Sequence, residues 1–262
     1  MAALWSASLC FKAFTMTDPL LIHGRPYSVS PEQTQDLPFR IRMAASEADL
    51  RQAVAVRTHA YGRHVPGMDA VLKEPEEDDY RDDAVLLLAE SKDDGQVLGS
   101  IRLLTNASHP LHLEQEINIP PQFHGRKLLE AWRLTVRNAP QARMVPAALY
   151  KSLYEVSYHS EIDFVLVVAR HPVDRLYKSM QFKEALGGHK LALSNTLNLP
   201  HGLFYLPVRE ADTLWRQARC PLYPFMALTS HPDIEIDHDV IRGRFHRAIS
   251  TNGGASTRNL TI

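Results

Sequence analysis

The segment Asp163–Ala169, DFVLVVA, constrains the fold of this chain more than any other. Its residues after the initial aspartate are all apolar, which is typical of a β-strand covered on both faces of a sheet. Segments with helical character precede it, at Pro146–Tyr158, and follow it, at Pro172–Met180. A strand enclosed in this way predicts a layered α/β fold.

Further strands, a hairpin and two more helices surround this strand in the sequence. Asp93-Asp94-Gly95 between two apolar segments indicates the hairpin. A helix is predicted to begin at Ser46, with Asp49 in an approximate capping box, and the last helix to begin at Asp212. This order predicts one mixed sheet and not a doubly wound nucleotide-binding fold. The predicted strands are Phe39–Ala44, Ala84–Glu90, Val97–Leu104, Leu128–Val136, Phe182–Leu186 and Leu203–Val208.

The 262 residues suffice for one large domain, which we place at residues 39–241. Residues 1–38 contain several prolines and no sustained period, so we expect a loosely ordered arm there. Residues 242–262 are rich in Thr, Asn, Gly and Ser, and we expect a flexible tail.

Composition excludes several classes of function. The net charge of −1 gives no indication of a nucleic-acid or anionic-membrane partner. The amino terminus has no basic region before its apolar residues, and no apolar stretch has the length of a membrane span. We therefore expect a cytoplasmic protein without integral membrane association. The histidine- and aspartate-rich segment 231–239 has no diagnostic ligand spacing, so we expect no metal and interpret it as polar surface.

Two arginines lie among apolar residues and need partners. Arg57 shares a helix face with Leu50, Val54 and Tyr61. We expect it to hold the acidic segment 74–83 by an ion pair, and contact with a ligand is the alternative. Arg102 lies in an otherwise apolar strand. It either binds the carboxylate of an amino acid or pairs with Asp79 or Asp82, and the sequence leaves both possibilities open.

Several short motifs together resemble known acyltransferases. His171-Pro172 followed by LYKSMQF, residues 176–182, resembles the end of GNAT acetyltransferases, with Gln181 in place of a glycine. GSIRLL, residues 99–104, and LEAWRLTV, residues 129–136, resemble a narrower group. That group comprises the acyl-homoserine-lactone synthases and the N-acyl amino acid synthases of the FeeM type.

The resemblance extends over roughly Phe39–Val208 and carries site residues with it. Trp132 stands where the lactone synthases have Ser or Thr, and their tryptophan after the first-helix motif is absent, which favours the N-acyl amino acid branch. The matching residues are Arg57 and Tyr61 on the first helix, the acids Asp79 and Asp82, Arg102, and the pair Glu130 and Arg133.

The resemblance implies a GNAT-like fold: a mixed, mostly antiparallel sheet with helices on both faces and splayed strands that form the thioester cleft. It also implies transfer of a medium- or long-chain acyl group to the amine of an amino acid or similar molecule. Glu130 would be the base and Arg133 its catalytic partner, with Arg102, Asp79, Asp82, Arg57 and Tyr61 binding substrate. Strict alternation puts Glu130 and Arg133 on opposite faces, so we expect a bulge, which would also supply an amide for the oxyanion.

The expected acyl donor is acyl carrier protein, with acyl-CoA as the alternative thioester. The loop Asn138–Arg143 has no glycine and contains Pro140, which lacks an amide hydrogen, so it suits a pyrophosphate poorly. Basic residues could dock the acidic carrier protein. They are Arg126, Lys127, Arg143 and Lys151.

Three other functions are consistent with the same motifs. One is an acyl-homoserine-lactone synthase with S-adenosylmethionine as acceptor. Another is a catalytically inactive acyl-binding module of the same fold. The last is an ordinary acetyl-coenzyme A enzyme.

Overall fold

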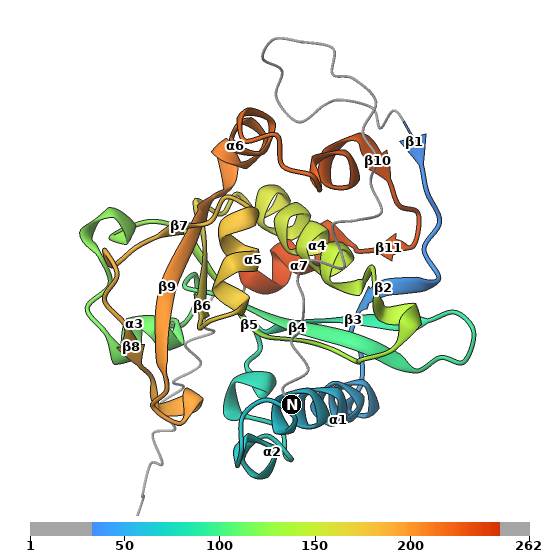
Figure 1. Cartoon of the computed structure of the whole chain (residues 1–262), viewed down its shortest axis with the longest axis horizontal. Coiled ribbons are helices and arrows are strands. Elements are labelled where there is room, and N and C mark those ends of the chain that lie inside the picture. Colours follow the sequence, from blue (N-terminus) through green and yellow to red (C-terminus); the bar gives the residue numbers. More distant parts are fainter. Residues whose placement is uncertain (1–32, 247–262) are drawn as a thin grey trace, which may run out of the picture.

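The computed structural model describes residues 33–246, and residues 1–32 and 247–262 lie outside the described part. One nine-stranded sheet dominates it (Figure 1). Its strands are β2 (Phe39–Met43), β3 (Val85–Ser91), β4 (Val97–Thr105), β5 (Leu128–Val136), β6 (Phe164–Ala169), β7 (Lys183–Glu184), β8 (Leu191–Ala192), β9 (Pro200–Pro207) and β11 (Ile234–Glu235). A separate two-stranded pair consists of β1 (Gln33–Thr34) and β10 (Thr229–Ser230).

The spatial order in the sheet is β11-β2-β3-β4-β5-β6-β9-β7, and β8 pairs with β9 outside this path. Only β11–β2 and β5–β6 are parallel within this sheet, and the other pairs are antiparallel. The predicted mixed, mostly antiparallel sheet is confirmed.

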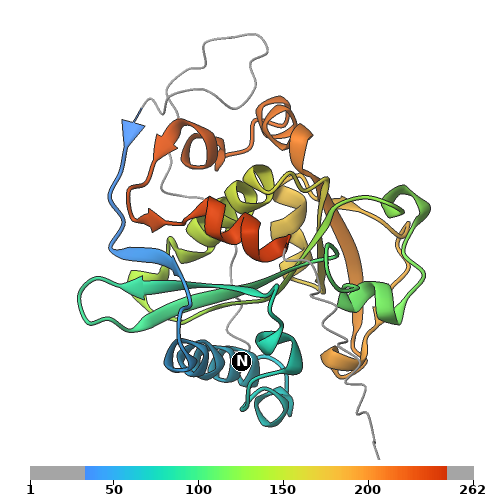
Figure 2. The ribbon, with the colours of Figure 1, turned by 180° about the vertical axis from the view of Figure 1, so that it is seen from behind.

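Helices cover both faces of the sheet, as expected (Figures 1 and 2). α1 and α2 lie below the sheet in both views, and α4, α5 and α7 lie above it. The helices are α1 (Glu47–Gly62), α2 (Met68–Val71), α3 (His112–Glu116), α4 (Val145–His159), α5 (Val173–Ser179), α6 (Ala211–Gln217) and α7 (His238–Phe245). Single turns are η2 (Glu77–Tyr80), η3 (Pro121–Phe123), η4 (Pro140–Ala142), η5 (Ser194–Thr196) and η6 (Val208–Glu210), with the wider turn η7 (Pro224–Leu228).

The largest core lies between the sheet and α4. Leu149, Leu153 and Val156 of α4 pack there on residues such as Val85 and Leu129 of the sheet. The opposite face has two smaller clusters. One joins α1 to β3 and β4, and the other joins the segment around α3 to β5, β6 and β9.

The first helix begins as the sequence predicts. The Ser46 hydroxyl accepts a hydrogen bond from the amide of Asp49 at 3.2 Å, which satisfies one donor of the first turn. The Asp49 carboxylate accepts a hydrogen bond from Arg42 of β2 at 2.7 Å. This pairing fixes the start of α1 against the sheet.

The described fold is longer at both ends than the expected domain 39–241. β1 pairs with β10, and the buried Leu37 donates its amide to the Asp233 carboxylate at 2.7 Å. The rest of the expected arm lies outside the described residues. α7 runs to Phe245, which is buried in the main core, so the expected tail begins too early and α6 is not the last helix. α7 was missed because its apolar residues are sparse.

The segment 231–239 is not a polar surface loop, because parts of it are built into the fold. It supplies β11 and the residue Asp237 that caps α7. His231 and Asp233 are buried. Lys151 contacts the His231 ring, and Lys92 forms an ion pair with Asp233. Within residues 33–246, no helix combines the length and the apolar character that a membrane crossing requires.

Candidate active site

The strands β5 and β6 separate in the middle of the sheet. They pair only from Leu128 to Glu130 on β5, opposite Phe164 to Leu166 on β6. Beyond that point β5 continues to Val136, and β6 continues to Ala169 as the partner of β9. Glu130 therefore occupies the last paired position, where the two strands part.

A β-bulge in β5 lies three residues after Glu130. Ser100 pairs with Thr135 and Arg102 with Trp132, so Arg133 and Leu134 together face a single residue of β4. Arg133 has φ of 55°, in the left-handed region that a bulky side chain rarely adopts. Because of the extra residue, side chains no longer alternate strictly between the two faces of the sheet. The Arg133 side chain therefore reaches the same face as Glu130 and Arg102. The expected bulge is present.

Glu130 is fully buried under the segment that contains α3. Its Oε2 accepts a long hydrogen bond from the Leu113 amide at 3.4 Å, and its Oε1 has no hydrogen-bond partner among residues 33–246. Burial raises the pKa of Glu130 to about 7, and the charge of Asp78 adds to the rise. The nearby Trp132 indole, the Leu113 amide and the charge of Arg102 oppose it. A carboxyl with this pKa can exchange a proton near neutral pH.

Three buried arginines converge beside Glu130 on the carboxylate of Glu76. Arg133 donates from Nε at 2.9 Å and from Nη2 at 2.6 Å. Arg57 and Arg102 each donate from Nη1 to Glu76 Oε2 at 3.1 Å. We call these three arginines with Glu76 and Asp79 the arginine cluster.

Asp79 is the second acid of the arginine cluster, and its side chain is fully buried. It accepts hydrogen bonds from Arg57 at 2.8 and 3.0 Å and from Arg102 at 2.8 Å. Burial by itself would raise the pKa of Asp79, but the bonds from Arg57 and the charges of both arginines lower it to about 2. Both acids stay ionised at neutral pH, since the pKa of Glu76 is also lowered despite its burial.

These contacts show which acids of the chain Arg102 and Arg57 meet, and substrate binding by either arginine stays a prediction. Arg102 pairs with Asp79, Glu76 and, at 3.3 Å, Asp78, and not with Asp82. Arg57 of α1 holds the acidic segment by ion pairs, as expected. Four residues further along α1, the Tyr61 ring lies 5.6 Å from the Arg133 guanidinium.

Asp82 lies apart from the arginine cluster. Its side chain is 53% exposed, and its carboxylate faces His109 at 3.4 Å. The acid that stands three residues from Asp79 in the arginine cluster is Glu76, which the sequence analysis missed. The cause is the crowding of acids in the segment 74–83, where several pairs have the same spacing.

The four basic residues expected to dock a carrier protein do not form one surface. Arg126 and Lys127 precede β5 and Arg143 follows it, so a strand of nine residues, about 25–30 Å, separates them. Lys151 is 4% exposed, and its Nζ donates to the carbonyls of Phe225 and Thr229. Its docking role is wrong, because α4 turns this side chain toward a chain segment distant in sequence.

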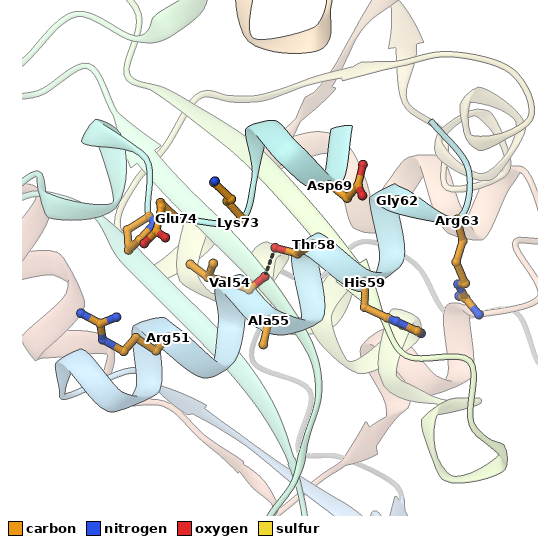
Figure 3. Close-up of a pocket in the computed structure, with 11 residues that line it drawn as sticks. Arg51, Val54, Ala55, Thr58, His59, Gly62, Arg63, Asp69, Lys73 and Glu74 are labelled. Atoms are coloured by element: carbon orange, nitrogen blue, oxygen red, sulfur yellow. Dashed lines mark hydrogen bonds between the residues drawn. The ribbon is translucent and has the colours of Figure 1, made fainter. Parts of the chain in front are cut away.

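Two surface hollows lie near α1. The larger, of about 660 Å³, lies between α1 and the segment that carries α2, with Arg51 and Glu74 near one end and Arg63 near the other (Figure 3). The smaller, of about 310 Å³, is lined by the β3–β4 turn and by residues 137–139 and 141. Neither is lined by Glu130 or by residues of the arginine cluster.

Comparison with known proteins identifies the family of the chain. A sequence model of the family described as N-acyl amino acid synthase FeeM matches residues 52–198, more than half of the chain. The chain belongs to this family. The matched residues include Glu130 and every residue of the arginine cluster. Membership of this family identifies the protein as an acyltransferase. No curated protein matches the sequence.

Solved structures share the GNAT-like fold of this FeeM-family chain. The structure of FeeM itself, from uncultured soil microbes, has 16% sequence identity and a TM-score of 0.53, and the match covers 69% of this chain and 97% of that one. The CoA-dependent acyl-homoserine lactone synthase BjaI, with SAM and isopentyl-CoA, has 16% identity and a TM-score of 0.51, over 78% of this chain and 99% of that one.

Proposed function

We propose that this protein is a cytoplasmic N-acyltransferase that moves a medium- or long-chain acyl group from acyl carrier protein to the amine of an amino acid or similar small molecule. The observation that carries the proposal is the position of Glu130. A buried carboxyl with a pKa of about 7 stands where β5 and β6 part, three residues before the bulge.

The proposed reaction is direct attack of the amine on the thioester. The Glu130 carboxylate accepts a proton from the attacking amine. The nitrogen bonds to the carbonyl carbon, the carbon–sulfur bond breaks, and the thiolate leaves and takes up a proton. A main-chain amide of the bulge Arg133–Leu134 would stabilise the oxyanion, and the Arg133 charge lies on the same side of the sheet.

The loop after β5 favours carrier protein over coenzyme A as the donor. Its amides at Ala139, Ala142 and Arg143 donate to carbonyls within the loop, and Pro140 has no amide hydrogen. Few amide donors therefore remain to bind the pyrophosphate of coenzyme A. The phosphopantetheine arm of a carrier protein has no pyrophosphate and does not need these donors. Of the four expected docking residues, Arg143 alone lies at the end where β5 and β6 have separated.

Purified protein incubated with acyl carrier protein thioester or acyl-CoA, and with amine acceptors, tests the proposal by mass spectrometry of the products. We expect an N-acyl amide from the carrier-protein thioester, and a loss of about 100-fold or more in rate for Glu130→Gln. A lactone product from S-adenosylmethionine would replace the proposal with an acyl-homoserine-lactone synthase. Acyl binding without turnover, unchanged in Glu130→Gln, would indicate an inactive binding module.

A further inference from the structure

We propose that His112, oriented by Glu116, receives the proton that Glu130 takes from the acceptor and passes it toward the surface. The inference rests on the proposed function and adds a proton route to it. It starts from buried polar atoms beside Glu130 that have no hydrogen-bond partner among the described residues.

Three such atoms lie on the side of the sheet that the segment with α3 covers. Glu130 Oε1, Trp132 Nε1 and His112 Nδ1 form no hydrogen bond within residues 33–246. Trp132 is the next residue on the same face of β5, and its indole lies close enough to lower the pKa of the Glu130 carboxyl. The His112 ring packs edge-on against the Trp132 ring, with 5.6 Å between their centroids. The carboxyl, the indole and the imidazole are therefore neighbours.

The donors and acceptors of these three groups suit one bound water. A buried water usually makes about three hydrogen bonds to polar groups that the protein does not satisfy itself. An indole nitrogen only donates, an ionised carboxylate only accepts, and an imidazole nitrogen without a proton accepts. A water between them would accept from Trp132 and donate to Glu130 and His112. Such a water would connect the carboxyl to the imidazole by a path along which a proton can move.

Glu116 determines which nitrogen of His112 takes up the proton. Its Oε1 lies 3.0 Å from His112 Nε2, one helical turn away. A carboxylate beside Nε2 holds the proton of the neutral ring on that nitrogen and leaves Nδ1 as the acceptor. Glu116 is itself held, because it accepts hydrogen bonds from the Ser194 amide at 2.9 Å and from the Ser194 hydroxyl. The side chains of His112 and Glu116 are 18% and 23% exposed, so the pair leads from the buried carboxyl to solvent.

The proposed reaction needs such a route when the acceptor arrives charged. An amino group is largely protonated at neutral pH. Glu130 first takes one proton from this ammonium, and that proton leaves through His112. After the nitrogen has bonded to the carbonyl carbon, Glu130 takes the second proton, and the thiolate receives it as the carbon–sulfur bond breaks. An ammonium and a thioester thus give an amide, a thiol and one released proton, and the fully buried Glu130 cannot pass that proton to solvent directly.

The charge of the acceptor tests this route. The first acceptor is the standard amino acid that wild type acylates fastest, and the second is its α-aminooxy analogue, whose amine is uncharged at neutral pH. The analogue releases no net proton, so it needs Glu130 but not His112. We expect His112→Gln to lower kcat for the amino acid by about tenfold or more, and kcat for the analogue by less than about twofold. Equal losses with both acceptors, or no loss with either, would overturn the inference.

Imidazole in the buffer gives a second measurement. We expect it to raise the amino-acid turnover of His112→Ala by about fivefold or more and to leave wild type unchanged. His124→Ala is the matched control, because His124 is an exposed histidine of the same segment, and its turnover should be that of wild type. A loss in His112→Ala that imidazole does not reverse would show that His112 and Glu116 only hold α3 to η5, and would overturn the inference.

Failure of the proposed function would look different. Absence of product from wild type with every amino acid and with both acyl donors would count against acyl transfer itself. Full activity in His112→Gln with none in Glu130→Gln would keep the base and remove only the proton route. Should the His112 variants not fold, Glu116→Gln decides, since it should lower turnover of the amino acid by about fivefold and leave that of the analogue unchanged.

Discussion

Arg133 donates through Nε and Nη2 to the two carboxylate oxygens of Glu76, although 57 residues separate them in the sequence. The pair joins the bulge of β5 to the acidic segment before β3. Through Glu76, the bulge is also connected to Arg57 of α1 and Arg102 of β4. The strand that carries the candidate base and the helix that covers it are thus fixed to one another by charge.

The activity should depend on the ionisation of Glu130. Because its pKa is about 7, we expect kcat/KM to rise about tenfold per pH unit below 7 and to level off above it. The measurement requires a weakly basic acceptor, such as an alkoxyamine, which stays uncharged over this range. Glu155 of α4 also has a pKa raised by burial to about 7 and is the control. Glu155→Gln should leave the profile unchanged, and a shifted profile would point away from Glu130.

The stability of the fold should also depend on the ionisation of Glu130, but it should fall, and not rise, as pH increases. A carboxyl whose pKa is raised on folding binds more protons in the folded than in the unfolded state between pH 4.5 and 7. The folded state therefore loses stability as pH rises through that window. Glu130→Gln removes this loss, so its free energy of unfolding should exceed that of wild type at pH 8 by roughly 3–4 kcal/mol. Urea denaturation at pH 4.5 and pH 8 measures the difference, which should be small at the lower pH.

Asp79 and Asp82 should differ sharply in their contribution to folding. Asp79→Asn removes a buried counter-charge from two arginines and should lower the free energy of unfolding by about 3–5 kcal/mol. Asp82→Asn changes an exposed side chain and should cost less than about 0.5 kcal/mol. Urea denaturation at neutral pH gives both values. Equal effects would show that the acidic segment is held in another way.

In wild type, the lowered pKa of Asp79 contributes stability that is present above pH 3.8 and lost as pH falls toward 2. Asp79→Asn should therefore lose less stability than wild type in this acid range. The two proteins should approach one another as the carboxyl of the wild type takes up its proton.

Docking of the carrier protein should depend on Arg143, which follows β5, and not on Arg126, which precedes it. Arg143→Glu should raise KM for acyl carrier protein by about fivefold and leave kcat unchanged, with the largest effect at low salt. Arg126→Glu, at the opposite end of β5, is the matched control and should leave KM unchanged. Steady-state kinetics at two ionic strengths measure both. A larger effect of Arg126→Glu would place the docking surface at the other end.

Much of the sheet could be predicted from the sequence because its strands are long and apolar. Leu128–Val136 was predicted with the bounds that the structure shows. The two-residue strands β1, β8, β10 and β11 carry too few side chains for a period to appear. α7 has only Ile241 and Phe245 as buried residues, and its other residues resemble a polar loop.

The site was predicted in part, for a physical reason. Glu130, Arg133 and Arg102 lie in short motifs of adjacent strands, and an arginine in an apolar strand requires a partner. Which acid it meets depends on how a surface segment turns back over the sheet, which spacing does not encode. Glu76 and Lys151 show this limit, since the Glu76 carboxylate binds Arg57, 19 residues away, and the Lys151 ammonium binds the Phe225 carbonyl, 74 residues away.

The pairing of β11 with β2 has a consequence for how the protein is made. The edge strand β2 pairs with β11, which comes almost a whole domain length later in the sequence. The amide of Leu37 likewise donates to Asp233, which lies 196 residues further on. While the ribosome synthesises the chain, this edge stays open until β11 has emerged. Translation that stops after α6 would leave it exposed to other chains, so prematurely ended products should aggregate.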